Sequence, residues 1–313
     1  MTDIVITEFM DELAVDSLRA DFDVSYDPDL HGDAAAVAGL LESARALIVR
    51  NRTRVGRDLL AAGPRLVAVG RLGVGLDNID LDACAERGVS VHPATGANVV
   101  AVAEYVVAAM LMMLRGAYHA TDRVLAGEWP RTELIGREAS GRTLGIVGFG
   151  AIGRAVAKRA AALGVDVAAY DPVLAPDDPA WSSQGVRRFG NLGAMLAECD
   201  VVTLHVPLTD ATRHLVGAAE IAAMRPGACI VNTARGGVLD EAAMALALAS
   251  GRLGAAALDV FEDEPLPAHS RLAGIPNLYL TPHVAGLTEE ANARTGELVA
   301  RLVRSALASA PDS

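Results

Sequence analysis

The chain has 313 residues, of which 52% are hydrophobic, 21% are charged and only 4% are aromatic. This composition excludes intrinsic disorder, and the length favours two domains over one. The formal net charge of −12 argues against nucleic-acid or anionic-membrane surfaces, and the scarcity of aromatic side chains argues against base-stacking platforms.

Short β-branched segments alternate with helical patterns through the first third of the chain. We expect strands at 3–7, 21–26, 46–49 and 65–69, and helices at 8–20, 33–43 and 56–62. An alternation of this kind predicts a parallel sheet with helices on both faces.

A long apolar helix is expected next, with Asn98 as its N-cap and its end near Gly116. Its apolar run is too short to span a membrane. An irregular polar stretch leads from it to Ser140. A second alternation follows, with strands expected at 143–147, 165–170, 200–205, 228–232 and 255–260 and helices at 154–163 and 288–307. The pattern as a whole predicts two α/β domains, each with a doubly wound parallel sheet.

The cysteines and the amino terminus indicate a cellular compartment. Cys84, Cys199 and Cys229 lie far apart, with neither a C-x-x-C pair nor clustered histidines. We therefore expect no disulfide framework and no metal site. Acidic residues stand where a signal peptide needs a basic start and an apolar core, so we expect a cytoplasmic protein.

The sharpest local motif is the segment 148–153, Gly-Phe-Gly-Ala-Ile-Gly, which lies between an expected strand and an expected helix. Gly148 would allow a tight turn, Gly150 would let a pyrophosphate approach the backbone, and Gly153 would let the helix pack on the strand. Asp171 ends the next strand, where an acid can bond both ribose hydroxyls of NAD and repel the 2′-phosphate of NADP. A plain turn beside an exposed acid is the alternative, but the matching context favours NAD.

Three titratable residues in the second half of the chain suit the oxidation of a hydroxy acid. Arg235 offers a bidentate fork for a carboxylate, His283 is a base suited to neutral pH, and Glu264 could hold that base. Taken singly, each has a plainer interpretation: a turn, a structural histidine, or a solvated acidic loop that also contains Glu262 and Asp263.

Together these motifs resemble the D-isomer-specific 2-hydroxyacid dehydrogenase family over essentially the whole chain. The segments that carry the resemblance are 70–78, 148–153, 232–237, 259–265 and 282–283. It implies a Rossmann NAD-binding domain at 98–286 and a flavodoxin-like substrate-binding domain made of 1–97 and 287–313. It also implies a catalytic triad of Arg235, Glu264 and His283, and a homodimer with the region 99–114 near its interface.

The motif and the resemblance together predict cofactor contacts along the carboxyl ends of the second set of strands. These are Gly148, Gly150, Ala151, Ile152, Gly153, Asp171, His205, Pro207, Thr233, Ala234, Arg235, Asp259, His283 and Gly286. On the substrate side the expected residues are Arg52, Arg71, Gly73, Val74, Gly75, Arg131 and Arg235.

Arg52 and Arg71 follow neighbouring expected strands, where a cation would suit a substrate with a second anion at C3. An Arg-rich surface is the alternative. Family members acting on 3-phosphoglycerate or 3-sulfolactate fit this feature, and segments 6–12 and 49–53 look more like the (S)-sulfolactate type. We therefore expect an NAD-dependent enzyme that interconverts such a D-2-hydroxy acid and its 2-keto acid. A hydroxypyruvate, glyoxylate or simple 2-keto acid reductase is one alternative, and an NAD(H)-sensing co-repressor on the same scaffold is another.

Overall fold

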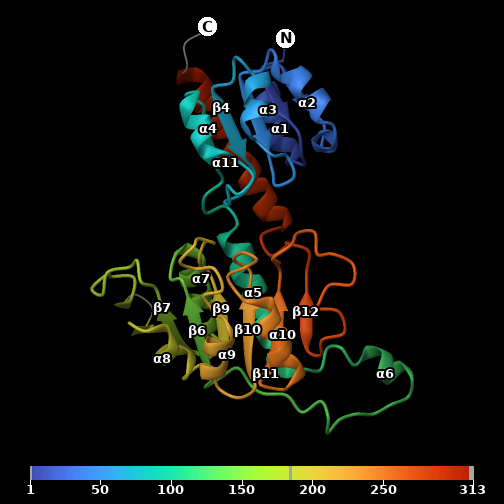
Figure 1. Cartoon of the computed structure of the whole chain (residues 1–313), viewed down its shortest axis with the longest axis vertical. Helices are drawn as coiled ribbons and strands as arrows, with labels where there is room; N and C mark the ends of the chain where they lie inside the picture. Colours follow the sequence, from blue (N-terminus) through green and yellow to red (C-terminus); the bar gives the residue numbers. More distant parts are fainter. Residues whose placement is uncertain (1, 183–184, 310–313) are drawn as a thin grey trace. The chain divides into compact units, whose positions relative to one another are not determined.

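The computed structural model describes residues 2–182 and 185–309, so Met1, Ser183, Gln184 and residues 310–313 lie outside it (Figure 1). The chain divides into two compact units, each with its own parallel sheet. Unit 1 is Met1–Asn98 with Leu287–Ser313, and unit 2 is Val99–Gly286. Within the described ranges, no helix combines the length and the apolar character that a membrane crossing requires.

The sheet of unit 1 has the strand order β2-β1-β3-β4-β5, with every described pairing parallel. This is the flavodoxin-like doubly wound order, as predicted. Its strands are β1 (Ile4–Ile6), β2 (Val24–Tyr26), β3 (Ala46–Val49), β4 (Ala68–Arg71) and β5 (Ser90–Pro93). Its helices are α1 (Glu12–Arg19), α2 (Ala34–Leu41), α3 (Arg57–Ala62), α4 (Leu81–Glu86) and α11 (Glu289–Ser309), with a 3-10 turn at Leu30–Gly32.

Strands β1 and β3 are buried along their whole length, which suits a parallel sheet covered on both faces. One core joins Ile4 and Ile48 to Val299 and Val303 of α11, and a second core lies on the other face, around Leu47. The last helix of the chain therefore completes a core that the first 98 residues begin. In Figure 1, α11 (red) runs beside β4.

Unit 2 has the sheet order β12-β11-β10-β9-β6-β7-β8. Counted from β6, this is the Rossmann order 3-2-1-4-5-6 with one more strand at the edge, so this prediction is confirmed as well. The strands are β6 (Thr143–Val147), β7 (Asp166–Tyr170), β8 (Arg187–Phe189), β9 (Val201–Leu204), β10 (Ala228–Asn232), β11 (Leu253–Leu258) and β12 (Leu278–Leu280). The helices are α5 (Val99–Arg115), α6 (Thr121–Leu125), α7 (Ala151–Ala161), α8 (Leu192–Leu196), α9 (Ala218–Ala223) and α10 (Glu241–Ala249).

Helices α5 and α7 cover one face of the unit 2 sheet, while α8, α9 and α10 cover the other. Eight apolar residues of α5, among them Val106 and Met110, are buried, and the helix packs against α7, β10 and β11. The apolar run that the sequence shows is therefore a core helix of unit 2.

Several element bounds differ from those expected. The first helix begins at Glu12 rather than at residue 8, because Asp11 caps it by accepting a hydrogen bond from Ala14 N at 3.4 Å. The fourth strand is shifted to Ala68–Arg71, which places Arg71 inside the strand instead of after it. Helix α7 begins at Ala151, directly at the glycine-rich loop, and the stretch expected to be irregular contains the short helix α6.

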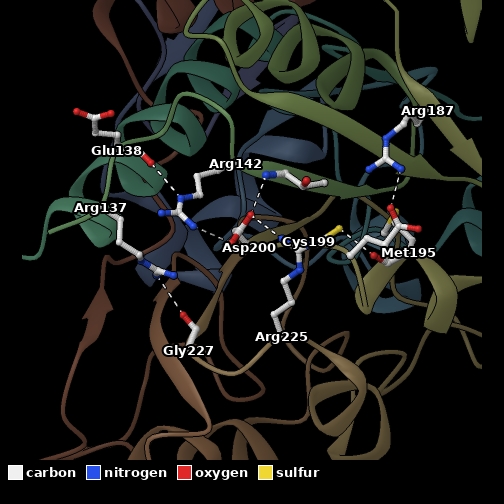
Figure 2. Close-up of polar contacts among 11 residues, drawn as sticks. Arg137, Glu138, Arg142, Arg187, Met195, Cys199, Asp200, Arg225 and Gly227 are labelled. Atoms are coloured by element: carbon white, nitrogen blue, oxygen red, sulfur yellow. Dashed lines mark hydrogen bonds and ion pairs between the residues drawn. The ribbon is translucent and has the colours of Figure 1, made fainter.

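The carboxylate of Asp200 joins the starts of neighbouring strands of unit 2 (Figure 2). It accepts a hydrogen bond from Thr143 N at 3.0 Å, and it lies 3.1 Å from Arg225 Nη1 and 3.5 Å from Arg142 Nη1. The Asp200 side chain is 9% exposed, whereas the two arginine side chains are 47% and 39% exposed. A single buried charge thus ties the beginning of β6 to the segments that precede β9 and β10.

Replacing Asp200 should therefore destabilise unit 2. We expect Asp200→Ala to lower the free energy of unfolding by about 2–3 kcal/mol, because a buried N–H and two guanidinium groups lose their acceptor. Urea unfolding measures this. The control is Glu198→Ala, which removes a pair with Arg187 that is about half exposed on both sides and should cost less than about 1 kcal/mol. Equal losses in the two variants would contradict the role of Asp200.

Candidate active site

The predicted site residues of unit 2, apart from Arg131, lie at or just after the carboxyl ends of six parallel strands, β6, β7, β9, β10, β11 and β12. The carboxyl ends of parallel strands share one edge of the sheet, which is where ligands bind in such folds. Arg131 is placed elsewhere: it is exposed, in the segment between α6 and β6.

The glycine-rich loop leaves β6 and enters α7 at this edge. Gly148 has a φ of +92°, and a Cβ on it would lie 2.5 Å from the His205 carbonyl oxygen, so this turn requires glycine. Gly150 is the N-cap of α7, and a Cβ there would meet nothing within 4 Å. Gly153 packs on the carbonyl of Gly148. The exposed backbone at the start of α7 can therefore accommodate an anionic group such as a pyrophosphate.

Asp171 holds this loop against the end of β7. Its Oδ2 accepts from Phe149 N at 2.8 Å, and its Oδ1 accepts from Val173 N at 2.9 Å. The ring of Phe149 is stacked on Trp181, with centroids 5.0 Å apart and planes within 6°. The sequence did not point to Trp181, because nothing in the irregular segment after β7 marks it as a partner of the loop.

His205 follows β9 and packs its carbonyl against Gly148. Its Nε2 lies 3.0 Å from Thr203 Oγ1. Burial lowers the pKa of His205 to about 3, so the ring is neutral near pH 7. Pro207 lies two residues further on and is exposed. His205 is thus unsuited to act as a proton acceptor near pH 7.

The turn that carries Arg235 is fixed by its neighbours. Asn232 accepts from Ala234 N at 3.0 Å and donates from Nδ2 to the Arg235 carbonyl at 3.0 Å. A Cβ on Gly236 would lie 1.6 Å from the carbonyl oxygen of Phe261, so only glycine lets the two backbones pass this closely. Arg235 is consequently held next to the loop that contains Glu264.

Thr233, in the same turn, has a buried Oγ1 without a hydrogen-bond partner among the described residues. An orphaned buried hydroxyl at the sheet edge where the glycine-rich loop also lies fits a site that a ligand completes. Ala234 beside it is buried.

Glu264 and His283 form a hydrogen-bonded pair. The His283 Nδ1 lies 2.8 Å from Glu264 Oε2, and the other carboxylate oxygen accepts from Phe261 N at 3.1 Å. Burial raises the pKa of Glu264, but the hydrogen bond and charge of His283, the Phe261 N–H and the charge of Arg235 outweigh it and hold the pKa below its usual range. The ionised carboxylate fixes the proton on Nδ1, which leaves Nε2 of the ring for a reacting group.

The structure distinguishes Glu264 from its acidic neighbours. Glu262 lies 3.3 Å from His214 Nε2 and accepts from Glu241 N at 3.3 Å, so its carboxylate faces the start of α10. The sequence pattern alone left the partner of His283 open among residues 262–264.

Asp259, at the end of β11, holds the loop that carries His283. Asp259 is 1% exposed and accepts from Thr281 Oγ1 at 2.6 Å, Val284 N at 2.8 Å and Ala285 N at 2.8 Å. His283 itself has a φ of +57°, a conformation that costs free energy for any residue except glycine. Both oxygens of Asp259 therefore anchor residues 281–285, a role that the expectation of a cofactor contact did not include.

Tyr105 of α5 contributes to the same anchor, and no motif in the sequence pointed to this residue. Its hydroxyl lies 2.6 Å from Thr281 Oγ1, and because that oxygen donates to Asp259, Tyr105 donates to it. Gly286 follows directly after the anchored loop, half-buried.

In unit 1, Arg52 and Arg71 are brought to the same sheet edge, since β3 and β4 are paired neighbours. Arg71 is half-buried and its guanidinium packs over Gly73, where a Cβ would lie 2.1 Å from Nη1. Arg52 is exposed, with Nη1 3.1 Å from His31 Nε2. Val74, between Gly73 and Gly75, is 41% exposed.

Comparison with known proteins gives consistent matches. The model of the family described as D-isomer specific 2-hydroxyacid dehydrogenase, NAD binding domain, matches residues 107–285. The (S)-sulfolactate dehydrogenase of Chromohalobacter salexigens is 53% identical over 307 residues, covering 98% of this chain and 99% of that protein. The D-3-phosphoglycerate dehydrogenase of Methanocaldococcus jannaschii is 42% identical over 267 residues, which are 85% of this chain but only 50% of that protein.

Among solved structures, D-lactate dehydrogenase from Aquifex aeolicus, complexed with NAD and lactic acid, is 29% identical to this chain. It superposes with a TM-score of 0.85 and covers 98% of this chain and 96% of its own.

Proposed function

Because the chain belongs to the D-isomer specific 2-hydroxyacid dehydrogenase family, we propose that it oxidises and re-forms a D-2-hydroxy acid with a second anion at C3, using NAD. The observation that carries the proposal is the 2.8 Å pair of His283 and Glu264, at the edge where Arg235 also lies. The similarity to a sulfolactate enzyme and to a phosphoglycerate enzyme supports the second anion. The reductases of simple keto acids and the NAD(H)-sensing co-repressor are less well supported.

The three residues divide the chemistry among them. When bound, NAD supplies the hydride acceptor. During oxidation, the Nε2 atom of His283 accepts the proton of the substrate hydroxyl. During reduction, Nε2 returns this proton to the carbonyl oxygen of the 2-keto acid. Glu264 keeps the ring in place through Nδ1 and balances the positive charge of the imidazolium. Arg235 holds the substrate carboxylate with its planar fork.

The cofactor contacts belong to the same proposal. The start of α7 would hold the pyrophosphate, Asp171 the adenosine ribose, and the Thr233 hydroxyl would find its partner in the bound cofactor. Further contacts are proposed at Ala151, Ile152, His205, Pro207, Ala234 and Gly286.

We propose that the carboxyl edge of the unit 1 sheet serves the substrate. There Arg71 and the segment Gly73, Val74 and Gly75 share an edge with Arg52. Arg131, which is exposed in the segment before β6, is proposed as a further substrate contact. The division into a substrate-binding unit 1 and an NAD-binding unit 2 follows from these roles.

Removal of the base is the first test of the mechanism. His283→Ala should lower kcat by about 10²–10⁴-fold, because general base catalysis is lost, while NADH binding stays nearly unchanged. Steady-state kinetics and NADH fluorescence measure the two effects. His119→Ala, at an exposed histidine outside the proposed site, is the control. A His283→Ala variant that keeps most of its kcat would rule out the assignment.

Asp171 should set the preference for NAD over NADP. Asp171→Ser removes the repulsive charge and also the acceptor for Phe149 N, so it should weaken NAD binding and relax discrimination against NADP. Asp171→Asn is the matched variant, because its amide oxygen can still accept from Phe149 N while the charge is gone. Titration of each variant with NADH and NADPH separates the two effects. Wild-type protein that uses both cofactors equally well would show that Asp171 does not select between them.

A substrate panel tests the proposed substrate class. The panel contains sulfolactate, 3-phosphoglycerate, glycerate and D-lactate, each with NAD. The two substrates with a second anion at C3, sulfolactate and 3-phosphoglycerate, should have the highest kcat/KM. Arg52→Ala or Arg71→Ala should reduce that preference by about tenfold to a hundredfold, as expected for lost hydrogen bonds to a charged group. Arg57→Ala is the control, since Arg57 pairs with Glu86 on the surface.

The other outcomes of the panel are distinct. If glycerate or D-lactate is the best substrate, the enzyme is a reductase of simple keto acids. If no substrate gives multiple turnovers, the protein is an NAD(H) sensor.

We also propose a homodimer. Helix α5 buries most of its apolar residues within unit 2, but in the segment after it four large apolar side chains are more than 70% exposed. They are Tyr118 at 74%, Leu125 at 82%, Trp129 at 76% and Ile135 at 78% exposure. Such a concentration of exposed apolar surface is typical of an interface. Light scattering should therefore give twice the chain mass of 32.4 kDa, and a stable monomer would refute the dimer.

We propose a reducing, cytoplasmic location because the three cysteines form no disulfide. Cys84, Cys199 and Cys229 are buried, unpaired thiols. Burial raises the pKa of Cys199 to about 12, which keeps this thiol protonated and unreactive. Thiols of this kind suit a compartment in which disulfides do not form.

A further inference from the structure

In unit 1, a buried carboxylate holds the loop that follows β3. We call residues 50–53, Arg-Asn-Arg-Thr, the arginine loop. Glu8 is 3% exposed, and its Oε1 accepts from Arg50 N at 2.8 Å and from Thr53 N at 3.0 Å. Its Oε2 accepts from Asn51 N at 3.2 Å and from Arg52 N at 3.0 Å. Four consecutive backbone N–H groups thus converge on one side chain.

The arginine loop is held from a second direction as well. Asn78 donates from Nδ2 to the carbonyl of Thr53 at 2.7 Å and to that of Arg50 at 3.2 Å. A buried contact of 2.7 Å joins Thr7 Oγ1 to Thr53 Oγ1. With all four backbone N–H groups and the carbonyls of Arg50 and Thr53 occupied inside the protein, the loop offers a ligand chiefly its side chains.

The charge of Glu8 is part of this arrangement. Burial raises the pKa of Glu8, but the bonds from Thr53, Arg52 and Arg50 outweigh burial, so the pKa lies below its usual value. Burial also lowers the pKa of Arg50, and the charge of Glu8 opposes that shift. The carboxylate is therefore an internal anion that satisfies the nest of N–H groups and supports a neighbouring cation.

We propose that Glu8 is a positioning residue that sets the direction of the arginine loop and, through it, the preference for substrates with a second anion. This inference rests on the proposed function, in which Arg52 contacts that anion. Glu8 touches no substrate: it acts by fixing the backbone from which the Arg52 side chain leaves. An isosteric amide cannot replace it, because the NH₂ group of glutamine would face two N–H donors.

The first test is Glu8→Gln, with sulfolactate and D-lactate as substrates. We expect the KM for sulfolactate to rise about tenfold to a hundredfold, because a small displacement of the contacting group is costly. The kcat for both substrates and the KM for D-lactate should change by less than about threefold. A raised KM with an unchanged kcat is the pattern of an interaction that binds the substrate and its transition state equally. Glu12→Gln, at an exposed carboxylate on the following helix, is the matched control.

The second test is Glu8→Ala with added acetate, which matches the atoms that the substitution removes. At constant ionic strength, acetate should lower the KM of this variant for sulfolactate towards the wild-type value, and should leave Glu12→Gln unaffected. Acetate should also restore slow hydrogen exchange of the amides of residues 50–53. A merely structural role of Glu8 would change stability without separating the KM values of the two substrates.

The outcomes separate this inference from the proposed function. If the wild type prefers sulfolactate and both Glu8 variants keep that preference, the positioning role is wrong. If the wild type shows no preference, the proposed substrate class fails, and with it the effect of Glu8 on specificity. In that case, the exchange rates of the arginine loop with and without acetate still decide whether Glu8 holds the loop.

Discussion

The loops that carry the proposed contacts of this protein depend on carboxylates that accept hydrogen bonds from backbone N–H groups. Residues that leave the end of a parallel strand lose their ladder partners, and their N–H groups need other acceptors. Asp259 supplies two of them for the His283 loop, Glu8 supplies four for the arginine loop, and Asp171 supplies one for the glycine-rich loop. In each case an acid at or near a strand end fixes a segment that carries a proposed contact.

The same constraint explains how His283, the proposed base, can be ordered despite its strained backbone. His283 has a left-handed backbone conformation, and Asp259 bonds the two residues that follow it. The side chain of Glu264 holds the Nδ1 atom of His283. The backbones of Gly236 and Phe261 pass close to each other, which brings the turn of Arg235 next to the loop of Glu264. The positions of the proposed base, its acidic partner and the proposed cation thus follow from backbone contacts made at three neighbouring strand ends.

The sequence predicts well what is decided locally. Strands β3, β6 and β10 have the expected bounds, because their apolar runs are buried on both sides. The edge strand β8 was not expected, since Arg187 and Arg188 give it no apolar pattern. Contacts across long separations leave no local pattern. Glu264 was selected over Glu262 by the family resemblance and not by the residues themselves, because the choice depends on loop geometry, and the hydrogen bonds that Glu8 accepts come from residues more than 40 positions away.

The proposed mechanism depends most directly on the anchoring of the His283 loop by Asp259. Hydrogen exchange in Asp259→Ala, compared with the wild type, measures it directly. We expect the amides of Val284 and Ala285 to exchange much faster in the variant while the amides of β6 stay protected, and we expect kcat to fall with that loss of protection. Unchanged exchange at Val284 and Ala285, together with an unchanged kcat, would show that Asp259 does not anchor the His283 loop.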